Sequence, residues 1–279
     1  MQMLKLGWNG ATCIKKSCVQ TDLELCEKYG YDYIELRLSM LEEYFKEHEL
    51  SDLYSFFSKN HLKPYAINSI ENVNFNTHEQ WEMLLDEFTH TCRIAQAIDC
   101  PYLIVVPSKR LYAKGKSEKE VFEDSINVLY KLADIAATYG VKLAFEPIGD
   151  RRWYCNSLQQ AWEIVKAVDR DNVGLTIDCI NIYMYDKCND LDILDEIDGN
   201  KIFVFHMNDC KNQPLSLIDP LTQRIMPGDG GIPIKNIINK IKATGYDGIA
   251  SLELFNNDYW EMDPDDVIRI GAEKCKIYL

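Results

Sequence analysis

The chain has 279 residues, of which 47% are hydrophobic, and its 44 acidic and 30 basic side chains give a formal net charge of −14 at pH 7. This acidity argues against binding to nucleic acid or other large polyanions, because such binding needs a basic face. The composition is that of an ordinary globular protein, and the length suits one (β/α)8 barrel. We therefore expect residues 1–279 to form a single barrel domain.

The cysteines and the start of the chain bear on the cellular compartment. The ten cysteines include no Cys-x-x-Cys pair, and most lie in segments that resemble helices or strands. Free cysteines there behave as small buried apolar residues of a reduced protein. The opening residues lack the apolar core of a signal peptide, and no apolar run approaches the ~20 residues that span a bilayer. These features predict a cytoplasmic protein.

Short apolar segments of strand length recur from one end of the chain to the other. Several are nearly continuous apolar runs, which are typical of parallel strands covered on both faces. The predicted strands are residues 4–9, 31–37, 64–69, 102–107, 141–147, 173–178, 201–207 and 248–255.

Longer amphipathic segments separate these strands. Helix starts carry capping patterns, such as Thr21 before Glu24 and Thr77 before Gln80. The predicted helices are residues 21–29, 51–60, 79–98, 118–139, 157–168, 189–198, 233–243 and 263–277. Eight such strand and helix units, without a linker or a Gly-x-Gly-x-x-Gly motif after a strand, favour a closed (β/α)8 TIM barrel over an open dinucleotide-binding sheet.

The ends of the last four predicted strands carry side chains that bind metals. In a (β/α)8 barrel, the carboxyl ends of the strands converge on one mouth, where active sites lie. The fifth to eighth strands end at Glu146, Asp178, His206 and Glu253. One carboxylate at a strand end is ordinarily a solvated residue. Three carboxylates and one imidazole on four successive strands instead indicate a shared metal site.

The ligand types narrow the choice of metal. One imidazole with three carboxylates suits a single divalent ion, Zn, Mn, Co or Mg, and leaves positions for substrate oxygens. No cysteine thiolate belongs to the set, which argues against a closed structural zinc site. We therefore expect an open, catalytic metal site.

Other polar and aromatic residues near the mouth are candidates for binding substrate. Asn9 and Asn68 suit substrate contact and loop capping equally well, since Asn also favours turns. Glu35 is expected either to contact substrate or to form a structural ion pair with Arg37. Arg224, in the loop after the seventh strand, is expected either to hold substrate or to be an exposed loop cation. Aromatic residues at the mouth, Trp153 among them, either stack on a sugar or pack the loops.

Four segments resemble a known family. They are DLELCEKYGYDYIELR (22–37), DRDNVGLTID (169–178), GNKIFVFHMND (199–209) and SLELF (251–255). On these segments the chain is identified as a member of the sugar-phosphate isomerase and epimerase superfamily with the xylose isomerase-like barrel. It is most similar there to the inosose (2-keto-myo-inositol) isomerases of inositol catabolism, and the resemblance covers essentially the whole chain.

The resemblance implies roles for individual residues. The family holds one divalent cation through residues that match Glu146, Asp178, His206 and Glu253, and its two glutamates act as acid and base on opposite sides of the substrate. The complete predicted substrate-binding set is Asn9, Glu35, Asn68, Trp153, Asn181, Asp209 and Arg224. Many members read Asp-x-x-His after the sixth strand, whereas this chain has Asn181 in place of that His. Asn is a poor metal ligand and does not carry protons near neutral pH, so the identity of the substrate stays undetermined.

The expected function is therefore that of a metal-dependent isomerase or epimerase in carbohydrate metabolism. Its substrate is a small polyol ketone or ketose, and its chemistry is proton transfer through an enediolate. The alternatives are a ketohexose 3-epimerase, a shikimate-type dehydratase and a polyol-binding barrel without catalysis. An apurinic endonuclease is disfavoured by the missing additional histidines and by the charge. We expect a small-molecule partner, no nucleic acid and no membrane, with a homodimer as one possible assembly.

Overall fold

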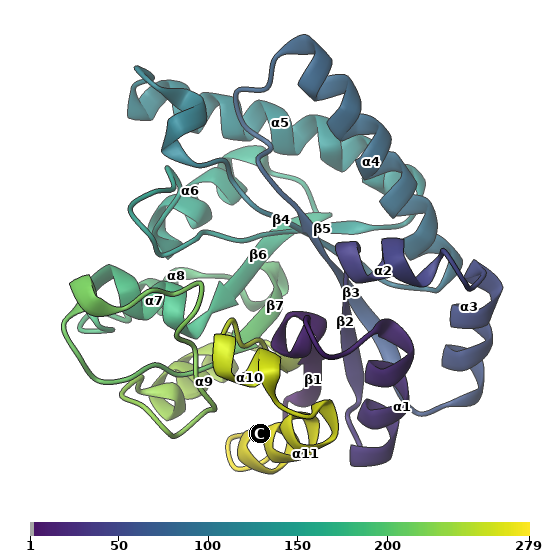
Figure 1. Ribbon diagram of the computed structural model, residues 1–279. Helices are drawn as coiled ribbons and strands as arrows, with labels where there is room; N and C mark the ends of the chain where they lie inside the picture. The colour runs from purple at the N-terminus through teal and green to yellow at the C-terminus, as the bar shows by residue number, and fades with distance from the viewer. Residues whose placement is uncertain (1–2) are drawn as a thin grey trace.

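The computed structural model describes residues 3–279, and its eight parallel strands close into a barrel in which β1 to β8 follow one another in chain order (Figure 1). The strands are β1 (Lys5–Asn9), β2 (Tyr33–Arg37), β3 (Lys63–Ile70), β4 (Tyr102–Val105), β5 (Lys142–Phe145), β6 (Val173–Asp178), β7 (Ile202–Met207) and β8 (Ile249–Leu252). All eight predicted strands are present. β5 and β8 are shorter than expected, and each ends one residue before a predicted metal ligand, Glu146 or Glu253.

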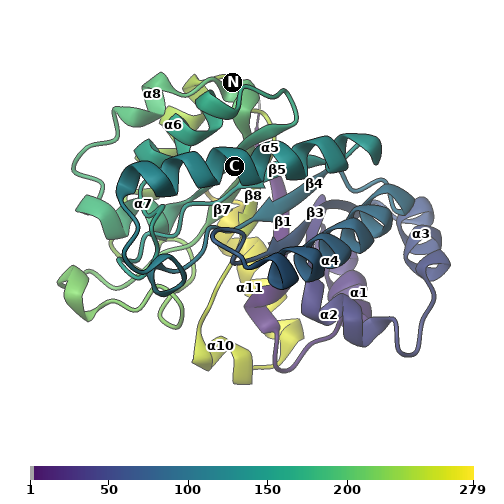
Figure 2. The same cartoon turned by 90° about the horizontal axis from the view of Figure 1, so that it is seen from above.

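Helices surround the barrel on its outside, as two perpendicular views show (Figures 1 and 2). They are α1 (Val19–Tyr29), α2 (Leu38–Tyr44), α3 (Leu50–Lys59), α4 (His78–Ala97), α5 (Glu118–Thr138), α6 (Leu158–Val168), α7 (Cys179–Asp186), α8 (Ile193–Glu196), α9 (Ile234–Ala243), α10 (Asn257–Glu261) and α11 (Pro264–Cys275). Four 3-10 turns also occur: Gly10–Cys13, Arg110–Ala113, Gly199–Lys201 and Leu215–Leu217. Within residues 3–279, no helix has the length and apolar character needed to cross a membrane.

Two helix predictions are corrected by the structure. The first helix begins at Val19, before Thr21, because Cys18 is extended and its carbonyl accepts the amide of Asp22. The predicted helix 189–198 is reduced to the short α8. The side chain of Asp190 accepts the amide of Asp192, a local bond that competes with the helical pattern just before α8. By contrast, Thr77 caps α4 as predicted and accepts the amide of Gln80.

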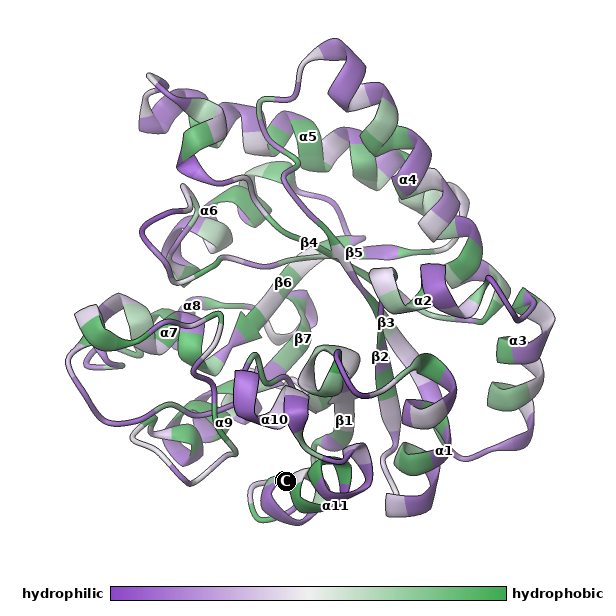
Figure 3. Cartoon of the chain, in the orientation of Figure 1, coloured by the Kyte–Doolittle hydropathy of each residue, from purple (hydrophilic) through white to green (hydrophobic). Residues whose placement is uncertain are grey.

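Alternation along the strands divides the core into two parts. Side chains that face outward, such as Leu143 and Phe145 on β5, join the large apolar cluster between strands and helices. The alternating residues, such as Ala144 on β5 and Val204 on β7, belong to a smaller cluster inside the barrel. Figure 3 shows the matching hydrophobic colour on the central strands and on stripes of the surrounding helices. Because side chains alternate with a period of two, the residues two positions beyond Ala144 and Val204 also face the barrel axis.

A buried carboxylate, Asp22, connects the first turn of α1 to β1. Asp22 on α1 is 1% exposed and accepts hydrogen bonds from the indole of Trp8 and the hydroxyl of Ser17. Burial raises the pKa of Asp22 to about 7, although the two hydrogen bonds lower it. The native protein therefore keeps this proton at pH values where the unfolded chain, with an ordinary pKa near 3.8, has lost it.

We expect Asp22 to lower the free energy of unfolding as the pH rises from about 4 to 7. The folded-state pKa is raised, so the unfolded state is favoured progressively through this window, by roughly 2–4 kcal/mol in total. Urea unfolding at several pH values should therefore show a shallower pH dependence for Asp22→Asn than for the wild type. Parallel pH profiles for the two proteins would contradict the shifted pKa. If the substitution also rearranges hydrogen bonds, it changes the free energy of unfolding by the same amount at every pH, which leaves the comparison of the two pH slopes unaffected.

Candidate metal centre

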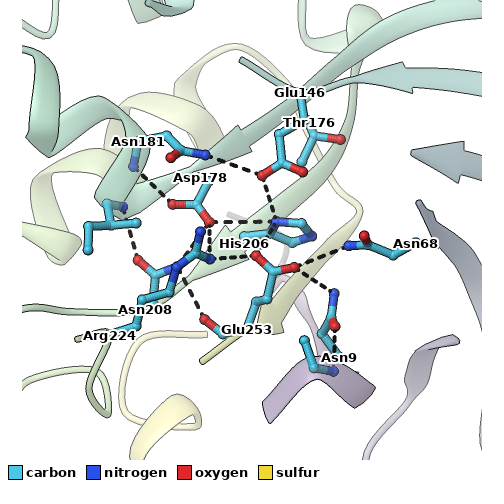
Figure 4. Close-up of polar contacts among 12 residues, drawn as sticks. Asn9, Asn68, Glu146, Thr176, Asp178, Asn181, His206, Asn208, Arg224 and Glu253 are labelled. Carbon is cyan, nitrogen blue, oxygen red and sulfur yellow. Dashed lines mark hydrogen bonds and ion pairs between the residues drawn. The ribbon is translucent and has the colours of Figure 1, made fainter. Parts of the chain in front are cut away.

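The four predicted metal ligands lie together at the carboxyl ends of β5 to β8 (Figure 4). Asp178 is the last residue of β6 and His206 lies on β7, while Glu146 and Glu253 directly follow β5 and β8. The alternation that places Ala144 and Val204 inside the barrel also turns Glu146 and His206 toward the axis. One ligand atom from each of the four side chains lies within 4.8 Å of the others.

The imidazole of His206 lies at the centre of this group. Its Nδ1 atom lies 3.2 Å from Glu253, 3.4 Å from Glu146 and 3.7 Å from Asp178. Nδ1 has no hydrogen-bond partner of adequate geometry among the described residues, although it is buried. A nitrogen that faces three carboxylates without such a bond is placed as a ligand atom would be.

Burial makes the charges of this group interact strongly. Glu146, Asp178, His206 and Glu253 are each at most 4% exposed. Burial raises the pKa of Glu146 to about 7, opposed by His206. Burial also acts to raise the pKa of Glu253, but the positive charges of His206 and Arg224 outweigh it and hold that pKa well below its usual value. For His206, burial favours the neutral form, yet the carboxylates around it raise its pKa well above 6.5.

A set of amide side chains fixes the orientation of Glu253. Asn9 and Asn68 each donate a hydrogen bond of 3.1 Å to Glu253 Oε1, and Arg37 in turn donates to Asn68 Oδ1 at 2.6 Å. Asn9 comes from β1, which neighbours β8 in the closed barrel, and Asn68 comes from β3. The two asparagines named from the sequence therefore contact a predicted metal ligand directly.

Arg224 lies over the same group as a buried cation and not as an exposed loop residue. It is 2% exposed, and its Nη1 donates to Asp178 Oδ2 at 2.8 Å and to Glu253 Oε2 at 2.5 Å. Its Nε donates to the carbonyl of Pro220, and its guanidinium lies 4.8 Å from the ring centre of Phe255. These contacts hold one positive charge against two of the carboxylates.

The donor set fits one divalent cation. Three carboxylates and an imidazole nitrogen converge within a buried space, and their negative charge exceeds what Arg224 offsets. Burying unpaired carboxylates is costly unless a cation compensates them. Oxygen and nitrogen ligands of this kind suit Zn, Mn, Co or Mg.

Comparison with known proteins places this site in a family. The family model for xylose isomerase-like TIM barrels matches residues 23–277. The chain belongs to this family. Over 97% of its length it is 37% identical to the inosose isomerase of Halalkalibacterium halodurans, 94% of which is covered. The inosose isomerase of Bacillus subtilis is 35% identical, with 97% of this chain and 96% of that protein covered.

A solved structure agrees with these sequence relatives. The crystal structure of an IolI protein with a bound zinc atom superimposes with a TM-score of 0.92 at 33% identity, over 99% of each chain. The TIM-barrel fold and the family resemblance predicted from the sequence are therefore confirmed.

Asn181 lies at the position where the family resemblance led us to expect a histidine. Its Nδ2 donates to Glu146 Oε1 at 3.3 Å, and its Oδ1 accepts the amide of Gly149 at 3.0 Å. The backbone at Gly149 is so close that a Cβ there would lie 2.3 Å from the Asn181 carbonyl. Asn181, on α7, thus connects the side chain of Glu146 to the backbone of Gly149, three residues further along the β5–α6 loop.

Two further residues of the predicted substrate-binding set, Trp153 and Glu35, lie in buried positions. Trp153 is 6% exposed and packs with the inner barrel cluster, and its ring faces the cations of Lys109 and Arg152. Glu35 is fully buried and contacts His206, while Arg37 pairs elsewhere, so the two do not form the expected ion pair. Their substrate contacts stay predictions.

Asp209 serves the loop that carries Arg224. Both of its carboxylate oxygens accept backbone amides, from Cys210, Gly228, Gly230 and Ile232. A Cβ on Gly230 would collide with the Cys210 carbonyl, so this close approach requires glycine. These bonds favour a loop-organising position for Asp209, and its expected contact with substrate stays a prediction.

Asn208 supports the candidate ligands but was not predicted from the sequence. Asn208 Nδ2 donates to Asp178 Oδ2 at 3.0 Å, and its side-chain oxygen Oδ1 accepts the amide of Ile180 at the start of α7. It lies two residues after His206, so the alternation of the strand places it on the same side as the ligands. Its spacing of two residues from His206 is the sequence feature that could have predicted its place beside the ligands.

Proposed function

We propose that this chain is a divalent-metal-dependent isomerase of inososes. The observation that carries the proposal is the pair of glutamates, Glu146 and Glu253, that face each other across His206 Nδ1 in the candidate metal centre. The full-length relatives at 35–37% identity are inosose isomerases, which favours a cyclic polyol ketone as the substrate. A catalytic pair needs carboxylates on two sides of one carbon framework, and this arrangement supplies them.

Glu146, Asp178, His206 and Glu253 would hold the cation. When bound, a divalent cation supplies Lewis-acid stabilisation of the negative charge that develops on the substrate oxygens. The four side chains come from rigid strand ends, so their ligand atoms need little ordering on binding.

The two glutamates differ in proton affinity, which suggests their roles. In the metal-free group the pKa of Glu253 is held low, so this carboxylate is ionised, which is the form that a base requires. We propose it as the group that removes the proton from the carbon next to the carbonyl. Glu146, with a pKa of about 7, carries or releases a proton near neutral pH. Carboxylates whose environments push their pKa values apart commonly divide the roles of base and acid.

The reaction balances as one proton leaving and one returning. Removal of a proton from the hydroxyl-bearing carbon next to the carbonyl leaves its electron pair on the substrate and gives an enediolate. Return of a proton to the former carbonyl carbon, with transfer of the hydroxyl proton between the two oxygens, moves the carbonyl to its neighbour. Return to the opposite face of the first carbon would give an epimer instead. We propose that Asn9, Asn68, Asn181 and Arg224, which each hydrogen-bond a candidate metal ligand, also orient the polyol hydroxyls. We propose the same role for Trp153.

The proposal is tested by supplying a panel of inososes and ketohexoses to the purified protein in deuterated water, with its metal content measured by elemental mass spectrometry. Deuterium at the carbon next to the carbonyl, together with an isomeric inosose, is the expected result. A 3-epimerised ketohexose or a product that has lost water would replace the proposal with one of its enzymatic alternatives. Bound metal and polyol without any exchange would identify a binding protein.

We further propose a cytoplasmic location and a small polyol as the ligand. The likeness to inosose isomerases supports both proposals. A homodimer stays a prediction.

A further inference from the structure

Glu35 lies behind His206 on the side away from the other carboxylates. It is on β2, is 0% exposed, and its Oε2 lies 3.1 Å from His206 Nε2. Its second oxygen, Oε1, is buried without a hydrogen-bond partner among the described residues. His206 is therefore the main group that compensates the burial of this carboxylate.

The two nitrogens of His206 face different surroundings. Nδ1 points to Glu146, Asp178 and Glu253, whereas Nε2 points to Glu35. A neutral imidazole carries its proton on one nitrogen and offers a lone pair on the other. The nitrogen that accepts a metal must be the one without the proton, so the position of this proton decides whether Nδ1 is a ligand.

We propose that Glu35 is a positioning residue that holds the His206 proton on Nε2 and so presents the Nδ1 lone pair to the cation. This inference rests on the metal centre of the proposed function. Without Glu35, the three carboxylates around Nδ1 would attract the proton to that nitrogen, where it competes with the metal. Carboxylates that accept the second N–H of a metal-binding histidine fix its tautomer and ring orientation, and their loss typically weakens metal binding 10- to 100-fold.

Glu35 acts from a rigid place. Its Cα pairs in register with Asn9 on β1 and with Ala66 on β3, in the interior of the sheet. His206, on β7, is likewise paired on both sides, with Asp178 on β6 and with Ser251 on β8. The contact between Glu35 and His206 therefore bridges two strands that are not adjacent in the barrel.

The first test is the dissociation constant for Zn²⁺, measured by competition with a chromophoric chelator. We expect Glu35→Ala to raise it about 10- to 100-fold. Glu35→Gln, whose amide oxygen still accepts the Nε2 proton but carries no charge, should lie between Glu35→Ala and the wild type. Asp22→Asn removes another fully buried carboxylate and should leave the constant unchanged. Equal constants for the wild type and both Glu35 variants would overturn the inference.

The second test observes the hydrogen bond itself. Of the five histidines, four lie outside the site and can be replaced together, as His48→Gln, His61→Gln, His78→Gln and His90→Gln. Proton–nitrogen NMR of the Zn²⁺-loaded single-histidine protein should show His206 protonated on Nε2, with a strongly downfield proton. Glu35→Gln should shift that proton upfield, and Glu35→Ala should lose it to exchange with water.

The two tests separate this inference from the proposed function. A residue that merely packs the barrel would alter stability without moving the Nε2 proton, so an unchanged resonance in Glu35→Gln overturns the positioning role. A wild-type protein that binds no Zn²⁺ would instead remove the metal centre itself. Since Glu35→Gln keeps the volume of the side chain, it provides a readout if Glu35→Ala does not fold.

Discussion

We expect Glu253→Gln to lower the turnover of an inosose by about 10²–10⁴-fold at saturating metal, while the protein stays folded. The substitution removes the proposed base and one of the four candidate ligands. Its effect is not limited to charge. Glu253 Oε1 accepts from Asn9 and Asn68, and Oε2 accepts from Arg224. The amide that this substitution introduces has a single acceptor oxygen, so its NH2 group would face either the two asparagine donors or Arg224, and that contact would be lost.

The measurement combines turnover, followed by NMR of the product, with thermal unfolding and metal affinity on the same preparation. Glu79→Gln, an exposed position on α4, is the matched control and should behave as the wild type. Measurement across a range of metal concentrations separates lost binding from lost proton transfer. Near-native turnover of Glu253→Gln at any metal concentration would exclude Glu253 as the base.

The barrel and the convergence of the four candidate ligands were predictable because both follow from short-range patterns. Eight apolar runs alternate with amphipathic segments, and the strand ends are then fixed to within a few residues. The regular alternation of strand side chains turns residues at spacing two, such as Ala144 and Glu146, toward the same interior. The closure of the barrel brings β5 to β8 side by side, so residues at successive strand ends meet without any further information.

The helices that directly follow strands were less predictable. α2 and α7 are short, and the apolar sequence of α7 has no clear polar face. Asp178 caps α7 by accepting the amide of Asn181, and the same carboxylate belongs to the metal centre. The position of Asp178 at a strand end suggested only a metal ligand, and its second role as a helix cap was not predicted.

The supporting contacts were not predictable from one sequence. Glu35 and His206 are 171 positions apart, and their contact depends on the register of strands that do not neighbour each other. Arg224 lies in a loop whose course depends on the four backbone amides that bind Asp209. Such pairings arise from the closed barrel as a whole. The sequence alone therefore could not decide whether Arg224 holds substrate or is an exposed loop cation.

Removal of the divalent cation with a chelator should abolish isomerisation and lower the melting temperature by about 5–10 °C. A cation present at 100 times its dissociation constant stabilises the folded state by about 2.7 kcal/mol, and each kcal/mol is worth about 2–4 °C for a chain of this size. The physical reason is the charge of the site. The carboxylates of Glu146, Asp178 and Glu253 are buried together, with Arg224 bound to two of them. Addition of Mn²⁺, Co²⁺ or Zn²⁺ should restore both activity and melting temperature.

The same charges make this stabilisation depend on pH. Glu146 has a pKa of about 7 in the metal-free group, so a proton occupies this ligand as the pH falls below neutrality and competes with the cation. The increase in melting temperature on addition of metal should therefore shrink between pH 8 and pH 6. His206→Ala and Asp178→Ala remove a ligand each and should show no such increase at either pH. Full activity in a preparation that elemental mass spectrometry shows to be free of metal would contradict the cation mechanism, and the glutamate pair would then have to act without it.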